Sequence, residues 1–109
     1  MVEGISGHVQ ATVAGIELQW QTQNETDIVG FHVLRQGPDG ALVLNSDLLL
    51  AQVSGQLAGS QYNFVDRDVE SGVSYSYLLQ VVYIDRAPAE YALDPVTAQW
   101  HLFLSQINR

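Results

Sequence analysis

The 109-residue chain has no cysteine, so it can form neither disulfides nor thiolate metal sites. Basic residues are also scarce: Arg35, Arg67, Arg86 and Arg109 stand against twelve acids, and the formal net charge is −8. Because positive charge is not clustered, neither nucleic acid nor an anionic membrane surface is an expected partner. No run approaches the roughly 20 apolar residues of a membrane-spanning helix, and residues 1–4 lack the basic and apolar parts of a secretion signal. We therefore expect no membrane insertion.

The chain does have enough apolar residues to form a core. They make up 47% of the sequence, against 15% charged residues, which is typical of a folded chain rather than a disordered one. The length is close to the commonest size of a single domain. We expect one domain over residues 1–98, followed by an apolar tail over residues 99–109.

Apolar and polar residues alternate along most of the chain, which is the period of a half-buried β-strand. Ile16, Leu18 and Trp20 show it most clearly, because a polar residue separates each from the next. No stretch keeps the 3.6-residue period of a helix. We predict an all-β fold, a seven-stranded antiparallel β-sandwich, with strands at residues 8–13, 15–22, 31–36, 41–44, 61–66, 73–84 and 89–98.

Two of these strands have features that place them in a sheet. Residues 73–84 are apolar at the odd positions and partly apolar at the even ones, including Leu78, Val82 and Ile84. Such a strand is expected at the centre of its sheet. Pro95 cannot donate a hydrogen bond to a neighbouring strand, so residues 89–98 are expected at an edge or with a bulge. The least regular part of the chain is residues 45–60, where we predict no strand.

The segment from Val69 to Tyr77 predicts a tight turn that leads into a core strand. Gly72 supplies the turn, and Tyr75 follows at the start of the strand, as in the tyrosine corner of β-sandwiches. We expect Tyr75 to bury its ring and to donate its hydroxyl hydrogen to the backbone near the turn.

Several short segments together resemble a fibronectin type III domain, in the variant common in secreted and surface proteins of bacteria. The resemblance covers about residues 9–98 and rests on these segments in order: Trp20, Glu25-Thr26-Asp27, residues 30–35, residues 62–66, Gly72 with Tyr75 and Tyr77, and residues 94–98. It implies a seven-stranded immunoglobulin-like sandwich, outside the cell or on its surface, used as a spacer, an adhesive module or an accessory to an enzyme. It implies no chemistry of its own.

The chain departs from this family in three places. The usual proline-glycine pair before the corner tyrosine is Ser71-Gly72, which keeps the glycine. The turn at residues 85–88 lacks the glycine that the family usually carries there. The sequence contains no Arg-Gly-Asp triplet, so integrin-type adhesion is not carried over.

Aromatic residues in the alternating pattern are the candidates for the core. A buried aromatic side chain removes about 150–250 Å² from water, so a few of them dominate the stability of a small domain. We expect the core to be formed by Trp20, Phe31, Tyr62, Phe64, Tyr75 and Tyr77.

Acidic residues near the loops raise the question of a calcium site, since calcium takes several oxygen ligands. The candidates are Glu25, Asp27, Asp66, Asp68 and Glu70, and none has the spacing of a calcium loop. We expect Asp27 and Asp66 instead to accept hydrogen bonds from loop amides or to pair with Arg35 and Arg67.

The sequence also offers no catalytic constellation. The three histidines, His8, His32 and His101, are isolated from one another, and no loop serine lies in a nucleophile elbow. We therefore predict no catalytic residue, no cofactor and no metal.

The apolar tail contains Trp100, Leu102, Phe103 and Leu104. One interpretation is that it extends the last strand or folds back over the open end of the sandwich. The other is that it docks into a neighbouring chain or domain, which includes a second copy of this chain.

The sequence thus predicts a non-catalytic structural or protein-interaction module of a bacterial extracellular or surface protein. Its partner would be another protein or a neighbouring domain of a longer chain. The alternative is a carbohydrate-binding accessory domain, which needs exposed aromatic rings. Tyr83, Tyr91 and Trp100 are the candidates for those rings.

Overall fold

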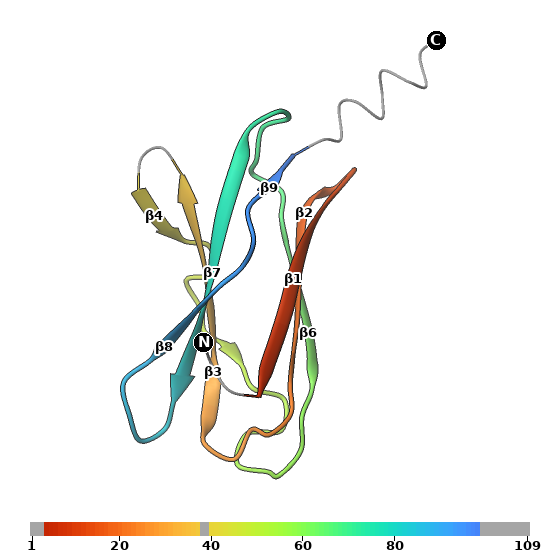
Figure 1. The fold of residues 1–109 in the computed structure, drawn as a ribbon. Helices are drawn as coiled ribbons and strands as arrows, with labels where there is room; N and C mark the ends of the chain where they lie inside the picture. The colour runs from red at the N-terminus through yellow and green to blue at the C-terminus, as the bar shows by residue number, and fades with distance from the viewer. Residues whose placement is uncertain (1–3, 38–39, 99–109) are drawn as a thin grey trace.

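The computed structural model describes residues 4–37 and 40–98, and over these ranges the protein is an antiparallel two-sheet β-sandwich without a helix (Figure 1). The predicted all-β sandwich class is confirmed, with nine strands in place of the expected seven. They are β1 (Ile5–Thr12), β2 (Gly15–Thr22), β3 (Ile28–Gly37), β4 (Gly40–Val43), β5 (Leu49–Leu50), β6 (Gln61–Asp66), β7 (Ser74–Tyr83), β8 (Ala89–Ala92) and β9 (Val96–Thr97). Because the described part has no helix, it has none that could cross a membrane.

The smaller sheet has the strand order β1-β2-β6. Its alternation places Ile16, Leu18 and Trp20 on the inner face, where all three are buried. The polar residues between them lie on the outer face, because successive side chains of a strand point to opposite sides. The register pairs Trp20 with Gly7 on β1 and with Tyr62 on β6.

The larger sheet has the order β4-β3-β7-β8, with β5 also paired to β3 and β9 paired to β7. β7 lies in its interior, between β3 on one side and β8 and β9 on the other, as its two-sided apolar pattern indicates. The last predicted strand is divided into β8 and β9, and Pro95 lies in the interval between them. Both parts lie at the sheet edge, in agreement with the placement expected from Pro95.

Strand β5 is the element that the sequence did not predict. Its Leu49 and Leu50 pair with Phe31 and Gly30 of β3. A side chain at Gly30 would collide with the Leu49 carbonyl, at 2.6 Å from the position of its Cβ. Between β4 and β5, the Asn45 side chain accepts a hydrogen bond from the Val33 N–H (2.7 Å) and donates one to the Phe31 carbonyl (3.0 Å). The Asn45 side chain thus takes the place of the backbone groups that a neighbouring strand would otherwise offer to β3 at this point.

The core is built around three aromatic rings that join the two sheets. Trp20 stacks on Tyr62, with 5.5 Å between the ring centroids and an interplanar angle of 13°. Phe31 of the opposite sheet lies edge-on to Trp20 at 5.6 Å and 4.8 Å from Tyr62. Tyr75 and Tyr77 are buried as well, whereas Phe64 is only partly buried at the margin of the core.

The turn before β7 has the geometry of a corner, with one correction to the predicted hydrogen bond. Gly72 adopts a φ of 84°, a left-handed conformation that favours glycine. The Tyr75 ring is buried, and its hydroxyl accepts a hydrogen bond from the Glu70 N–H at 2.9 Å. The expected direction was the reverse: the hydroxyl oxygen serves as the acceptor because the backbone group that faces it is an N–H.

We predict that Tyr75→Phe lowers the free energy of unfolding by about 1 kcal/mol, because the Glu70 N–H loses its acceptor. Chemical denaturation of the variant and the wild type measures the difference. Tyr91→Phe is the matched control, since the hydroxyl of the partly buried Tyr91 has no hydrogen bond among the described residues. Equal losses in the two variants would show that the corner hydrogen bond contributes nothing.

Candidate functional site

The five acids considered as calcium ligands do not come together. Glu25 and Asp66 are buried in separate networks at opposite ends of β6. Asp27 pairs with Arg86 at 2.6 Å, which replaces the expected pairing with Arg35 or Arg67. Asp68 and Glu70 are exposed. Among the described residues, no group of three or more histidine, aspartate or glutamate side chains is placed to hold a metal ion.

Glu25 forms the first of the two buried networks, with none of its surface exposed. Its carboxylate accepts hydrogen bonds from the Thr22 hydroxyl (2.6 Å), the Tyr62 hydroxyl (2.5 Å) and the Val53 N–H (3.0 Å). No ion pair reaches it from the described residues, so these three donors alone compensate the carboxylate. A buried charge held in this way requires every donor to be in place.

The two hydroxyls of this network can act only as donors toward Glu25. The Tyr62 oxygen already accepts the Gln52 N–H (2.9 Å), and the Thr22 oxygen accepts the Ser60 N–H (3.0 Å). The backbone of Glu25 also bonds to Gly55, Gln56 and Ala58. Glu25 therefore fastens residues 52–60 to the loop between β2 and β3, which is a structural role.

Asp66 forms the second network, and it ties the two sheets together. On the smaller sheet its carboxylate accepts the guanidinium of Arg35 from β3 (2.8 Å) and the hydroxyl of Tyr77 from β7 (2.7 Å). Arg35 also donates to the Asp68 carbonyl at 2.8 Å. The expected pairing of Asp66 with an arginine is thus present, and the partner is Arg35.

The aromatic rings that would bind a sugar are covered rather than exposed. Tyr83 and Tyr91 are partly buried against the core, and the Arg86 guanidinium lies 4.0 Å from the centre of the Tyr83 ring. No tryptophan, tyrosine or phenylalanine side chain is classed as exposed within the described ranges. Trp100, the third candidate, lies outside the described residues, and so do the tail residues Leu102, Phe103 and Leu104.

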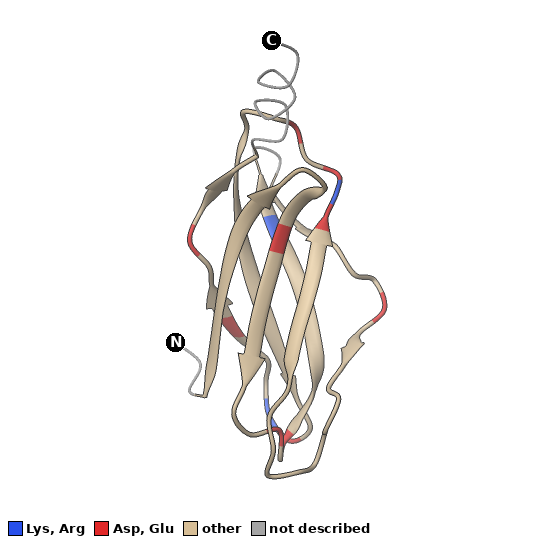
Figure 2. Cartoon of the chain, turned by 90° about the vertical axis from the view of Figure 1, so that its right-hand side faces the viewer, with Lys and Arg blue, Asp and Glu red and all other residues tan. Residues whose placement is uncertain are grey.

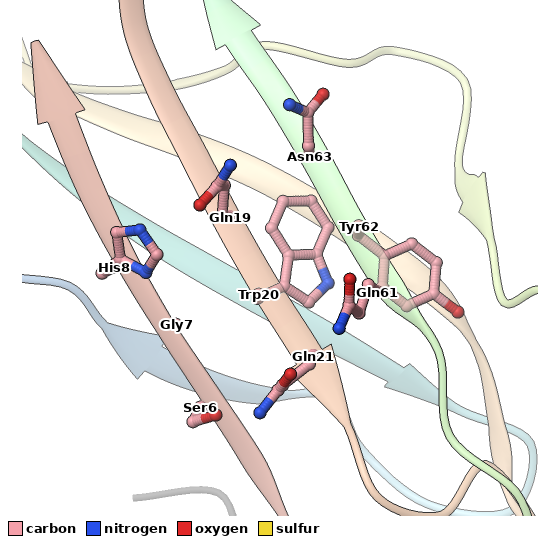
Figure 3. Close-up of a pocket in the computed structure, with 9 residues that line it drawn as sticks. All are labelled: Ser6, Gly7, His8, Gln19, Trp20, Gln21, Gln61, Tyr62 and Asn63. Atoms are coloured by element: carbon pink, nitrogen blue, oxygen red, sulfur yellow. The ribbon is translucent and has the colours of Figure 1, made fainter.

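The outer face of the smaller sheet is polar and slightly hollowed. Two cross-strand rows of hydrogen-bonding side chains cover it, one formed by Ser6, Gln21 and Gln61 and the other by His8, Gln19 and Asn63. They line a depression of about 560 Å³ (Figure 3). Of these six side chains, only that of Asn63 has a hydrogen-bond partner in the described protein, Glu17. The depression presents neutral hydrogen-bonding groups to solvent.

The outer face of the larger sheet carries two cross-strand rows of apolar residues. The register places Val43, Leu34, Leu78 and Ala92 in one cross-strand row and Gly30 and Val82 in another. Leu50 is paired with Gly30, and because Leu49 packs against the core, Leu50 points outward. We call this surface the apolar face, formed by Leu34, Val43, Leu50, Leu78 and Val82, with Ile84 directly after the end of β7.

The apolar face and the residue that follows it hold three of the six exposed large hydrophobic side chains in the described protein. Val43 is 48% exposed, Leu50 67% and Ile84 73%. A polar row formed by His32, Gln80 and Glu90 crosses between the two apolar rows. Charged residues gather mainly in loops and at strand ends, and they leave the sheet faces largely uncharged (Figure 2).

The apolar even positions of residues 73–84, Leu78, Val82 and Ile84, predicted that this strand lies at the centre of its sheet, and no exposed apolar face was predicted from them. Val43 and Leu50 belong to the apolar face because of the register of β4 and β5 against β3. That register cannot be predicted from the local sequence pattern.

Comparison with protein-family models found no family that matches this chain, and comparison with curated proteins found no match. The distinguishing features of the chain are its fold, an antiparallel β-sandwich, and the two contrasting outer faces of its sheets.

We predict that Glu25→Gln lowers the free energy of unfolding by about 1–3 kcal/mol. One carboxylate oxygen of Glu25 accepts from the Val53 N–H, and the other accepts from the Thr22 and Tyr62 hydroxyls. The amide of glutamine replaces one of these oxygens with an NH₂ group, which cannot accept. In either orientation, at least one buried donor therefore loses its acceptor. Chemical denaturation measures the loss, and Glu70→Gln, at an exposed side chain, is the control. A loss no larger than that of the control would contradict the network.

The same network predicts a loss of stability in alkali. Burial, together with the hydrogen bond to Glu25, raises the pKa of Tyr62 to about 12, from 10.0. The unfolded chain therefore releases this proton near pH 10 and the folded chain near pH 12. The stabilisation is complete below pH 10 and is lost as the pH rises toward 12, by roughly 1.4 kcal/mol for each unit of pKa difference.

Denaturation curves between pH 8 and pH 12 measure this decline. Tyr62→Phe should make it shallower without abolishing it, because burial also raises the pKa of Tyr77. An unchanged pH dependence in the variant would show that the Tyr62 hydroxyl is not the group concerned.

Proposed function

We propose that this protein is a non-catalytic structural or protein-interaction module, of the fibronectin type III kind, from a bacterial extracellular or surface protein. The observation that carries the proposal is the apolar face of the larger sheet. An antiparallel sheet that has one face in water normally alternates apolar residues inward with polar residues outward. β1 and β2 follow this rule, whereas β3 and β7 carry leucine or valine on both faces.

Contiguous exposed apolar side chains on a small domain are a frequent mark of a protein-binding surface. Leu50 and Ile84 contribute little to the core of the single domain, because most of each side chain is exposed. Contact with a partner would remove them from water. This surface therefore supports a role in which the domain packs against another protein or a neighbouring domain.

The resemblance to fibronectin type III domains supports the same role. The seven longer strands divide into three on the smaller sheet and four on the larger, which is compatible with the seven-stranded sandwich that the resemblance implies. The corner at Tyr75 is a feature of such sandwiches. The location outside the cell rests on this resemblance alone.

The carbohydrate-binding alternative is less well supported. Sugar rings stack on exposed aromatic side chains. Trp20 and Tyr62 line the depression on the smaller sheet, but both are buried, and the exposed groups around it are amides, a hydroxyl and an imidazole. The apolar tail at residues 99–109 stays a second candidate contact for a protein partner, since it lies outside the described residues.

Site-specific photo-crosslinking tests the interaction role. A photoreactive amino acid is placed at Leu50 on the apolar face or, as the matched control, at Gln19 on the outer face of the smaller sheet. Both full-length variants are produced in the cells that naturally make the protein. We expect Leu50 to yield a defined crosslinked protein species and Gln19 to yield none. Equal crosslinking at the two positions, or none at Leu50, would contradict the proposal.

A further inference from the structure

The triplet Asn24-Glu25-Thr26 has a spacing that no other asparagine of the chain has. It places threonine two positions after asparagine with no proline between them, which is the acceptor pattern for N-linked glycosylation in secreted proteins. We propose that Asn24 is such an acceptor and carries a sugar chain on its amide nitrogen. The inference goes beyond the proposed function and shares with it only the location outside the cell.

The triplet lies in a surface loop, which is the structural context that this pattern requires. It belongs to the connection between β2 and β3, at one end of the sandwich (Figure 1). Both Asn24 and Thr26 are exposed. A sugar chain at Asn24 would therefore extend into solvent without displacing any side chain of the core.

The amide nitrogen of Asn24 differs from those of the other two asparagines in the described ranges. Nδ2 of Asn45 donates to the Phe31 carbonyl at 3.0 Å. Nδ2 of Asn63 donates to the Glu17 carboxylate at 2.5 Å. Nδ2 of Asn24 has no hydrogen-bond partner in the described protein. Joining a sugar to this nitrogen would therefore break no hydrogen bond of the fold.

Thr26 fixes the orientation of the Asn24 amide. The Thr26 N–H donates to Asn24 Oδ1 at 2.8 Å, and the Thr26 hydroxyl donates to the same oxygen. These two bonds hold the carbonyl side of the amide toward the loop and leave the Nδ2 side unbonded. A serine hydroxyl can replace the second donor, whereas the side chain of valine cannot.

Glu25, the middle residue of the triplet, determines when the sugar can be added. It is fully buried, its N–H donates to the Ala58 carbonyl at 3.1 Å, and its carbonyl accepts the Gly55 N–H at 2.8 Å. An enzyme could bind the chain on both sides of Asn24 only by opening this network. The transfer therefore takes place before Glu25 is enclosed, and the modified chain then folds with the sugar outside.

The transfer requires an activated sugar, in which C1 is bonded to a phosphate oxygen. The bond between C1 and this oxygen breaks, and its electron pair leaves with the phosphate. A new bond forms between C1 and Asn24 Nδ2, and one amide proton passes to a base of the transferring enzyme. Atoms and charges balance without an oxidant or a reductant.

Mass spectrometry of the protein from the cells that naturally make it tests the site. We expect the intact mass to exceed that of the sequence by whole sugar residues, and the peptide with Asn24 to carry them. The peptide with Asn63 is the matched control, since Asn63 is also exposed but has Val65 two positions later. An Asn24 peptide found only at its unmodified mass would overturn the proposal, and so would equal modification of the two peptides.

Three full-length variants made in the same cells test the triplet itself. Asn24→Gln and Thr26→Val should each abolish the added mass, and Thr26→Ser should retain it because serine keeps the hydroxyl. All three alter exposed positions whose side chains bond only within the triplet, so the buried network around Glu25 stays intact. A sugar retained in Thr26→Val, or lost in Thr26→Ser, would contradict the assigned role of the hydroxyl.

The outcomes separate this inference from the proposed function, because the two experiments read different residues. If the photo-crosslinker at Leu50 captures a partner while Asn24 is unmodified, the interaction role stands and only the glycosylation is wrong. If Asn24 carries sugar while Leu50 captures nothing beyond the Gln19 control, the glycosylation stands and the interaction role fails.

Discussion

The rest of the structure depends on the two contacts of the Tyr62 side chain. Its ring packs against Trp20, and its hydroxyl donates a hydrogen bond to Glu25. The Tyr62 ring lies flat on Trp20 and close to Phe31, so it takes part in the aromatic cluster that joins the two sheets. Its hydroxyl leaves the core and donates to a carboxylate that no water reaches. The same side chain therefore couples the packing of the sheets to the closure of one end of the sandwich. Because the donors of this network are already committed, it tolerates few substitutions.

Asp66 provides a similar arrangement at the opposite end of β6. It too accepts a tyrosine hydroxyl, from Tyr77, but it adds an arginine from the facing sheet. Two of the acids that make this chain so negative are thus internal, and each is held by specific donors. Buried polar groups of this kind add little net stability, but misaligned sheets would leave them without partners. These buried groups therefore favour the observed alignment of the two sheets over shifted alignments.

The two outer faces differ because their strands have different patterns. β1 and β2 alternate strictly, so their outward residues are polar and the smaller sheet can remain in water. β3 and β7 carry apolar residues on the outer face as well as the inner one, although His32 and Gln80 interrupt them, and apolar residues on both faces are usual in sheets that are covered on both sides. A module with one solvated face and one apolar face is suited to being packed on one side only. That asymmetry, more than any single residue, underlies the role proposed for this domain.

Local patterns in the sequence determined the all-β class, most strand positions, the central place of β7, the edge position that follows from Pro95, and the corner at Tyr75. These features depend on alternation and turn residues, which act between close neighbours in the chain. Only the tertiary structure decided what depends on distant pairs. Glu25 was considered as a surface ligand and is instead enclosed by residues 52–60, while β5 and the Asn45 side chain complete the edge of β3. The apolar face likewise exists only once β4, β5 and β8 are in register. The sequence around a carboxylate or a leucine is the same whether solvent or protein covers the side chain. Only the fold determines which of the two it contacts.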